Sequence, residues 1–160
     1  MLYPQLLKGD FEKLPRALRD FHTAPGGGRA SGTVVVRRAI GWLAGLIGFP
    51  ASGEDIPLQL QVIVSDDEEI WIRSFGGVER RSIQRKQGDL LLEVAGPVRV
   101  LFRILADQTG MRFQSQRARL WMIPLPLRID AHAWGDDSRW EFQVTVAMVG
   151  SYRGEMVPTL

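Results

Sequence analysis

The sequence predicts a mainly β fold (α+β), a curled antiparallel meander of eight or nine strands that forms a cup or barrel. Turn-forming residues recur roughly every 8–12 residues after Pro57, as they do between consecutive antiparallel strands. Helical patterns occur only near the front of the chain. Because so many strands would leave open edges and a bare face in a flat sheet, we expect the sheet to curl or close.

Composition limits the classes of protein to consider. The 160 residues are 45% hydrophobic, enough for a single domain over 1–160 with its own core. A net charge of +2 gives no strong field for nucleic acid, so no nucleic-acid partner is expected. Without cysteine, and with two histidines, we predict no metal site and no cofactor. The first residues do not resemble a signal peptide, so we predict a cytoplasmic protein without a transmembrane segment.

Two helices are predicted at the front of the chain. Residues 10–22 carry apolar side chains at a 3-4-3 spacing, which indicates one short amphipathic helix. Residues 24–30, with three successive glycines, are interpreted as a flexible connector. The strand Gly32–Arg38 follows, rich in β-branched residues. The predicted apolar stripe of the first helix comprises Phe11, Leu14, Leu18 and Phe21.

The second predicted helix, Ala39–Pro50, lies between the first two strands and is apolar on all sides. About 12 residues are too few to cross a bilayer, which needs about 20. Burying six large side chains would contribute roughly 9–18 kcal/mol, whereas each interior glycine costs about 1 kcal/mol. We therefore predict a helix buried in the core, with a glycine–alanine side that lets another backbone or a ligand come close; a bound ligand is expected beside this helix, near Trp42. The bulky side comprises Ile40, Trp42, Leu43, Leu46, Ile47 and Phe49.

Two segments of the meander are more polar than the rest. Glu79–Lys86 is rich in arginine and is interpreted as a solvated edge strand. Tyr152-Arg-Gly154 follows the last strong apolar face and is interpreted as a structural corner, or alternatively as part of a cavity mouth. The strands are predicted at residues 58–64, 70–75, 79–86, 90–94, 98–104, 111–122, 127–133 and 140–148.

Several short motifs, taken in order, resemble a bacterial family known as domain of unknown function 4166, and the likeness runs over most of the chain. The family has no established activity. Its members occur alone or behind a saccharopine-dehydrogenase-like domain, so the resemblance implies an oxidoreductase as a partner. This chain has no strand–GxGxxG–helix of its own, and it ends Gly154-Glu-Met156 where the family has Gly-Trp-Leu. The motifs are residues 10–22, Gly48-Phe-Pro50, Gly53-Glu-Asp-Ile-Pro-Leu58, Trp71-Ile-Arg-Ser-Phe-Gly-Gly77, Ile123-Pro-Leu-Pro126 and Tyr152-Arg-Gly154.

Trp71, Arg73 and Phe75 share one face of a predicted strand, because successive side chains alternate. If that face points inward, Arg73 can bind a ligand carboxylate or phosphate. The structural alternative is an arginine stacked on its aromatic neighbours and paired with a carboxylate. Together with Trp42, Tyr152 and Arg153, these residues form the predicted ligand-binding set.

Three functions remain open. The leading hypothesis is a non-catalytic β cup that binds a small hydrophobic or amphipathic, lipid-like molecule in an apolar cavity. The second is a small-barrel enzyme, such as an isomerase, cyclase or hydrolase, with Asp130, His132 or Glu141 as its titratable group. The third is an interaction domain that docks on an oxidoreductase through an exposed apolar patch.

Overall fold

The computed structural model describes residues 1–39, 41–65 and 67–159, and at 43 and 46 it describes the backbone alone. In this part of the chain three α-helices and one 3-10 helix accompany eleven strands. In chain order they are α1 (Leu2–Leu7), η1 (Lys8–Lys13), α2 (Arg16–Thr23), β1 (Arg29–Arg38), α3 (Gly41–Leu46), β2 (Gly53–Ser65), β3 (Glu68–Phe75), β4 (Val78–Gln87), β5 (Leu90–Ala95), β6 (Val98–Asp107), β7 (Gly110–Leu120), β8 (Ile123–Leu125), β9 (Ile129–Gly135), β10 (Trp140–Val146) and β11 (Gly150–Pro158).

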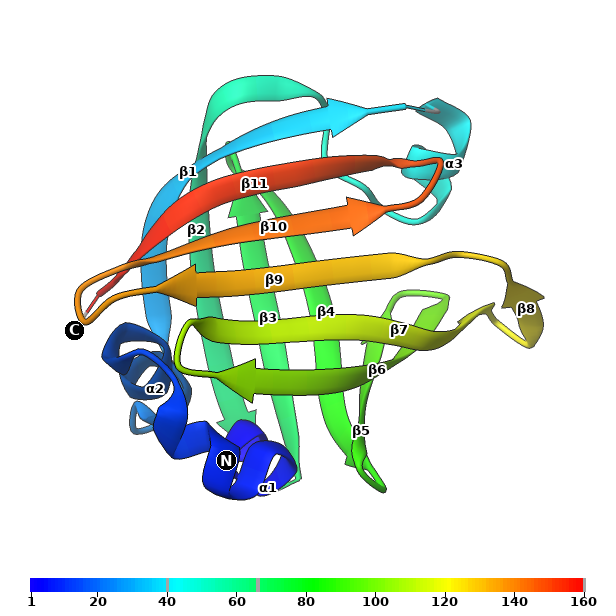
Figure 1. The fold of residues 1–160 in the computed structure, drawn as a ribbon. Helices are drawn as coiled ribbons and strands as arrows, with labels where there is room; N and C mark the ends of the chain where they lie inside the picture. Colours follow the sequence, from blue (N-terminus) through cyan, green and yellow to red (C-terminus); the bar gives the residue numbers. More distant parts are fainter. Residues whose placement is uncertain (40, 66, 160) are drawn as a thin grey trace.

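Ten of the strands close into one antiparallel barrel (Figure 1). Neighbours in sequence are neighbours in the sheet from β1 to β7 and from β9 to β11, and β7 pairs with β9. The ring closes where β1 pairs with β11, from Ala30 opposite Pro158 to Arg38 opposite Gly150. The short strand β8 pairs with β7 outside the ring. The predicted antiparallel barrel is confirmed, but the prediction of eight or nine strands is too low.

The last strand escaped prediction because glycine interrupts its apolar face. Tyr152, Gly154 and Met156 alternate on the inner side of β11. A Cβ at Gly154 would lie 2.1 Å from the backbone oxygen of Thr33 on β1, so the close seam between the two strands excludes a side chain there. The predicted corner at Tyr152 is therefore part of the strand that closes the barrel.

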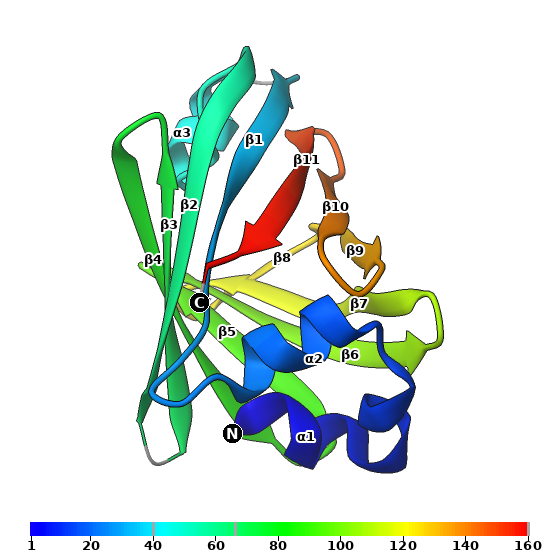
Figure 2. The ribbon, with the colours of Figure 1, turned by 90° about the vertical axis from the view of Figure 1, so that its left-hand side faces the viewer.

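The barrel has two different ends, and the N-terminal helices lie across one of them (Figure 2). We call this the closed end; α1 contacts β4 and β6, and α2 contacts β11 there. The opposite end, called the open end, carries α3, the hairpin that contains β8, and the turns β3–β4, β5–β6 and β10–β11 (Figure 1).

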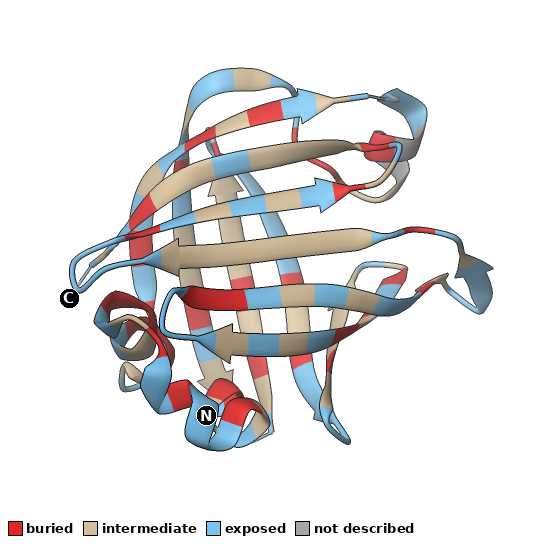
Figure 3. Ribbon diagram, in the orientation of Figure 1, coloured by how far each residue is buried: buried red, intermediate tan, exposed pale blue. Residues whose placement is uncertain are grey.

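The predicted amphipathic helix is divided in two, and a further helix precedes it. Pro15 separates η1 from α2, and Leu14 before it has the extended backbone that a residue preceding proline favours. The predicted stripe is nevertheless buried, with each of its four side chains at most 3% exposed. Figure 3 shows buried residues gathered in α1 and α2 and alternating along the strands. The helix α1 was not predicted.

The predicted apolar helix is shorter than expected, and only part of its described side chains lies in the core. The helix α3 has six residues and lies at the open end, where Trp42 is 76% exposed. Among its described side chains the small Ala44, on the glycine–alanine side, is fully buried, and Phe49, just beyond α3, is 6% exposed. The strands and the N-terminal helices supply most of the core. The predictions for Ile40 and for the side chains of Leu43 and Leu46 lie outside the described residues.

The polar strand β4 is not an edge strand, because it pairs with β3 on one side and β5 on the other. Its inner side chains, Ser82 and Gln84, are 3% and 2% exposed. The described helices include none long and apolar enough to cross a membrane.

Candidate ligand-binding cavity

The barrel encloses a cavity of about 630 Å³. At the closed end its lining residues are buried, among them Tyr3, Phe21 and Trp140. At the open end the lining includes exposed residues such as Arg80 and Gly96, so the cavity communicates with solvent there. This volume lies within the range of small-molecule binding pockets.

One side of the cavity is apolar and is formed by β6, β7, β9 and β10. Phe102 and Phe113 meet edge to face, with ring centroids 6.2 Å apart. The small side chain of Ala131 on β9 lies between Phe113 on β7 and Val144 on β10, which keeps this part of the cavity wide. The side chains on this wall are Val100, Phe102, Met111, Phe113, Ile129, Ala131, Ala133, Phe142 and Val144.

The other side carries a hydrogen-bonded polar group on β3, β4 and β5. Arg73 donates one hydrogen bond from Nη1 to Ser82 Oγ (2.8 Å) and one from Nη2 to Glu93 Oε1 (3.2 Å). Ser82 Oγ in turn donates to Glu93 Oε1 (2.6 Å). The guanidinium also lies 5.0 Å from the ring centroid of Trp71. This arrangement matches the structural alternative for Arg73, and the polar group faces the cavity.

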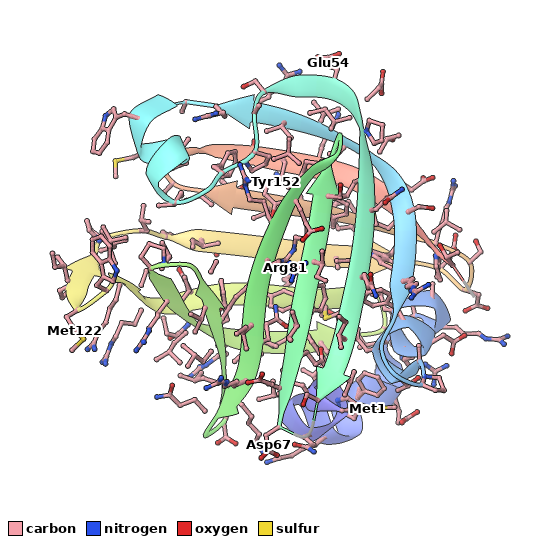
Figure 4. All side chains as sticks on the ribbon, turned by 180° about the vertical axis from the view of Figure 1, so that it is seen from behind. Met1, Glu54, Asp67, Arg81, Met122 and Tyr152 are labelled. Atoms are coloured by element: carbon pink, nitrogen blue, oxygen red, sulfur yellow. The ribbon has the colours of Figure 1, made fainter. Side chains whose placement is uncertain are left out.

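Tyr152 adds a phenol to the same cavity, from β11. Its ring packs edge on against Phe49 and Phe75, at 5.6 Å from each. Burial raises the pKa of Tyr152; the guanidinium of Arg73 opposes the shift and Glu93 adds to it, so the phenol stays neutral at physiological pH. Its hydroxyl makes no hydrogen bond within the described part of the chain, and Tyr152 lines the cavity. In Figure 4, Tyr152 lies inside the barrel behind β3 and β4, and Arg81 lies on β4.

The floor of the cavity, at the closed end, is held by buried hydrogen bonds. The hydroxyl of Tyr3 donates to Gln84 Oε1 (2.8 Å). The Leu2 backbone N–H donates to Glu69 Oε1 (3.1 Å), and Trp71 Nε1 donates to Glu69 Oε2 (3.3 Å). Burial raises the pKa of Glu69, and these hydrogen bonds oppose the shift. The helix α1 is thereby fixed to the barrel wall.

His22 stacks on Tyr3 in this floor, with ring centroids 3.8 Å apart. It is 6% exposed, and its Nδ1 has no hydrogen-bond partner in the described part of the chain. Burial lowers the pKa of His22 to about 3, so the imidazole is neutral at physiological pH. It is a packing residue at the end of α2.

The structure brings together four of the six predicted ligand-binding residues. Trp71, Arg73, Phe75 and Tyr152 line the cavity. Trp42 is exposed on α3, and Arg153 is exposed on the outer face of β11. Sequence reasoning missed Ser82, Gln84, Glu93 and Tyr3. A charged Glu93 between inward Leu91 and Ala95 was a usable signal, because it interrupts an otherwise apolar face of a strand.

The three titratable candidates for catalysis alternate along β9 and β10 with the inward side chains, and of the three His132 alone is among the residues that line the cavity. Asp130 accepts a hydrogen bond from Arg128 Nε (2.9 Å), and Glu141 is exposed. His132 stacks on Trp134, with ring centroids 4.7 Å apart, and burial lowers its pKa, with Arg112 adding to the shift. Within the described residues, no group of three or more His, Asp or Glu could hold a metal ion.

Comparison of the chain with protein-family models, with curated proteins and with solved structures finds no match. The resemblance to the domain of unknown function 4166 family therefore stays a prediction.

Proposed function

We propose that the barrel is a binding protein for a small amphipathic molecule whose polar head is uncharged. The observation that carries this proposal is the two-sided cavity. The apolar wall around Phe102, Phe113 and Val144 suits a hydrocarbon body. The opposite wall offers the Arg73–Glu93 pair and the hydroxyl of Tyr152 to a polar head.

The charge balance of the inner part of the polar wall favours a neutral head. Arg73 is already compensated by Glu93, and both side chains are largely shielded, at 23% and 21% exposure. A carboxylate bound against this pair would leave a net negative charge in a poorly solvated space, which is costly; the other arginines of the lining, Arg80 and Arg81, are exposed at the open end. A hydroxyl or carbonyl head avoids that cost, because the ion pair can supply it with N–H donors and a carboxylate acceptor.

A competition experiment tests the chemistry of the head. Nile red, a neutral apolar dye, should fluoresce on entering the cavity, and dodecanol should displace it at lower concentration than dodecanoate. In a Glu93→Gln variant the order should reverse, because Arg73 then lacks its counter-charge. A preference of the wild-type protein for dodecanoate would contradict the neutral head.

A second pair of variants tests whether binding takes place inside the barrel. Ala131→Phe places a ring in the apolar half of the cavity and should abolish Nile red binding. Gln143→Phe places the same ring on the outer face of β10 and should leave binding unchanged. Thermal unfolding of both variants checks that they fold. Equal binding by a folded Ala131→Phe variant would rule out the cavity as the site.

A further inference from the structure

Five exposed apolar side chains gather at the open end of the barrel. They have the highest exposed fractions of any large hydrophobic residues in the described part of the chain, from 61% to 76%. They project from α3, from the turn between β7 and β8 together with the start of β8, and from the β10–β11 turn. Figure 4 shows Met122 projecting from the hairpin that contains β8. We call this set the apolar edge: Trp42, Trp121, Met122, Ile123 and Met148.

Two of these side chains sit on backbone that favours glycine or asparagine. Trp121 has φ 51° and Met148 has φ 65°, both in the left-handed region. A bulky residue is unfavourable there, yet the chain carries Trp and Met at these positions. Strain of this kind accumulates where side chains serve a function other than folding.

Arginines lie beside the apolar edge on the outer face of β6 and β7. Arg99 is opposite Arg119 across the two strands, and Arg117 follows on the same face of β7. Within the described residues none of the three forms an ion pair, and the buried Nε of Arg119 has no hydrogen-bond partner. Because β8 pairs with β7 at Arg119, the arginines flank the hairpin that carries Trp121 and Met122.

Three carboxylates of the open end lie elsewhere on its rim. Glu54 and Asp55 belong to β2, and Glu79 belongs to the start of β4. Glu54 is paired with Arg37 at 3.3 Å, and Glu79 is paired with Arg81. Near the apolar edge, Asp130 is paired with Arg128 at 2.9 Å. The apolar edge and its arginines therefore form one cationic, apolar side of the open end.

We propose that the open end docks on an anionic lipid surface through the apolar edge, with Arg99, Arg117 and Arg119 at the lipid phosphates. Tryptophan favours the boundary between headgroups and acyl chains, and short apolar protrusions insert there. Guanidinium groups bind phosphate bidentately and are attracted to anionic headgroups. A second copy of the chain fits less well, because a symmetric contact would place these arginines close to their own copies.

This inference does not rest on the proposed ligand, because the surface is separate from the cavity. If both proposals hold, docking places the opening of the cavity against the membrane. An amphipathic ligand can then pass between the membrane and the cavity.

Vesicle flotation tests the proposal. The protein should float with vesicles of phosphatidylcholine and phosphatidylglycerol, should float less with phosphatidylcholine alone, and should be released by salt. Brominated lipids should quench the fluorescence of the exposed tryptophans. A Trp42→Ser, Trp121→Ser double variant should bind at least about tenfold more weakly. The matched control is Leu105→Ser, which removes an apolar side chain of 49% exposure on β6, toward the closed end, and should bind as the wild type does.

A charge variant completes the test. Arg99→Gln with Arg119→Gln should lose the preference for anionic vesicles, whereas Arg29→Gln, at the closed end of β1, should keep it. The proposal is overturned by absence of flotation, by equal binding to both kinds of vesicle, or by binding that survives loss of both tryptophans. Sedimentation velocity that shows a dimer, dissociated by the tryptophan variant, would assign the surface to a second copy instead. Thermal unfolding confirms that each variant folds.

Discussion

The two ends of the barrel treat some of their aromatic and glycine residues in opposite ways, although Phe49, Phe75 and Tyr152 pack together inside the open end. At the closed end, Tyr3, His22 and Trp71 stack on one another, and glycines pack against backbone. At the open end, Trp42 and Trp121 project into solvent, and the glycines of α3 have free space around them. The same residue types therefore stabilise the fold at one end and leave the other end accessible. The closed end therefore contributes most to the stability of the fold, and the open end gives access to the cavity. Substituting one residue at each end and comparing the two effects tests this difference.

The largest expected difference compares one aromatic residue from each end. Tyr3 is fully buried, so Tyr3→Ala should lower the free energy of unfolding by about 4 kcal/mol, through the cavity that it leaves and the lost hydrogen bond to Gln84. Trp42→Ala should change it by less than about 0.5 kcal/mol, because the side chain is mostly in solvent. Chemical denaturation measures both. Equal losses would mean that α3 contributes to the core.

A pair of glycines gives the next largest effect. A Cβ at Gly28, in the α2–β1 connector, would lie 2.3 Å from the Phe21 backbone oxygen and within 2.7 Å of the Phe21 ring. Gly28→Ala should therefore cost about 3 kcal/mol. Gly45→Ala, in the exposed helix α3, has its nearest contact at 4.0 Å and should stabilise the protein by up to about 1 kcal/mol. Melting temperatures that move in the same direction would contradict this contrast.

The smallest of the three effects depends on pH. Below about pH 6.5 His22 gains a proton in the unfolded chain, but in the folded protein it stays neutral until about pH 3. The unfolded state therefore binds more protons in this interval, and stability falls as pH falls. Between pH 7 and pH 5 the loss should be about 2 kcal/mol.

The variant His22→Phe should remove this loss, and it should leave stability at pH 7 nearly unchanged because Nδ1 has no partner to lose. The difference between wild type and variant isolates His22 from Glu69, whose raised pKa acts with the opposite sign. Parallel pH profiles for the two proteins would show that His22 titrates normally in the fold.

The regular spacing of strands and turns could be predicted from the sequence. The amphipathic stripe and the shared face of Trp71, Arg73 and Phe75 could be predicted as well. The strand pair that closes the ring could not, because it joins segments more than 100 residues apart in sequence and depends on Gly154. The burial of Ser82 and Gln84 was also missed, since polar side chains in a strand normally indicate solvent. Here they line a cavity that only the closed ring creates. The prediction for the segment of α3 held only in part, because its burial was inferred from apolar content alone: Ala44 and Phe49 are buried, whereas Trp42 projects into solvent.

The β1–β11 seam also governs how the protein forms during synthesis. After β1 emerges, the ribosome adds the 111 residues between Arg38 and Gly150 (150 − 38 − 1) before the partner strand begins. At roughly 5–20 residues per second this takes roughly 6–22 s, during which one edge of β1 lacks its final partner. An unpaired edge of this kind recruits other strands, so the nascent chain is the most aggregation-prone form of the protein.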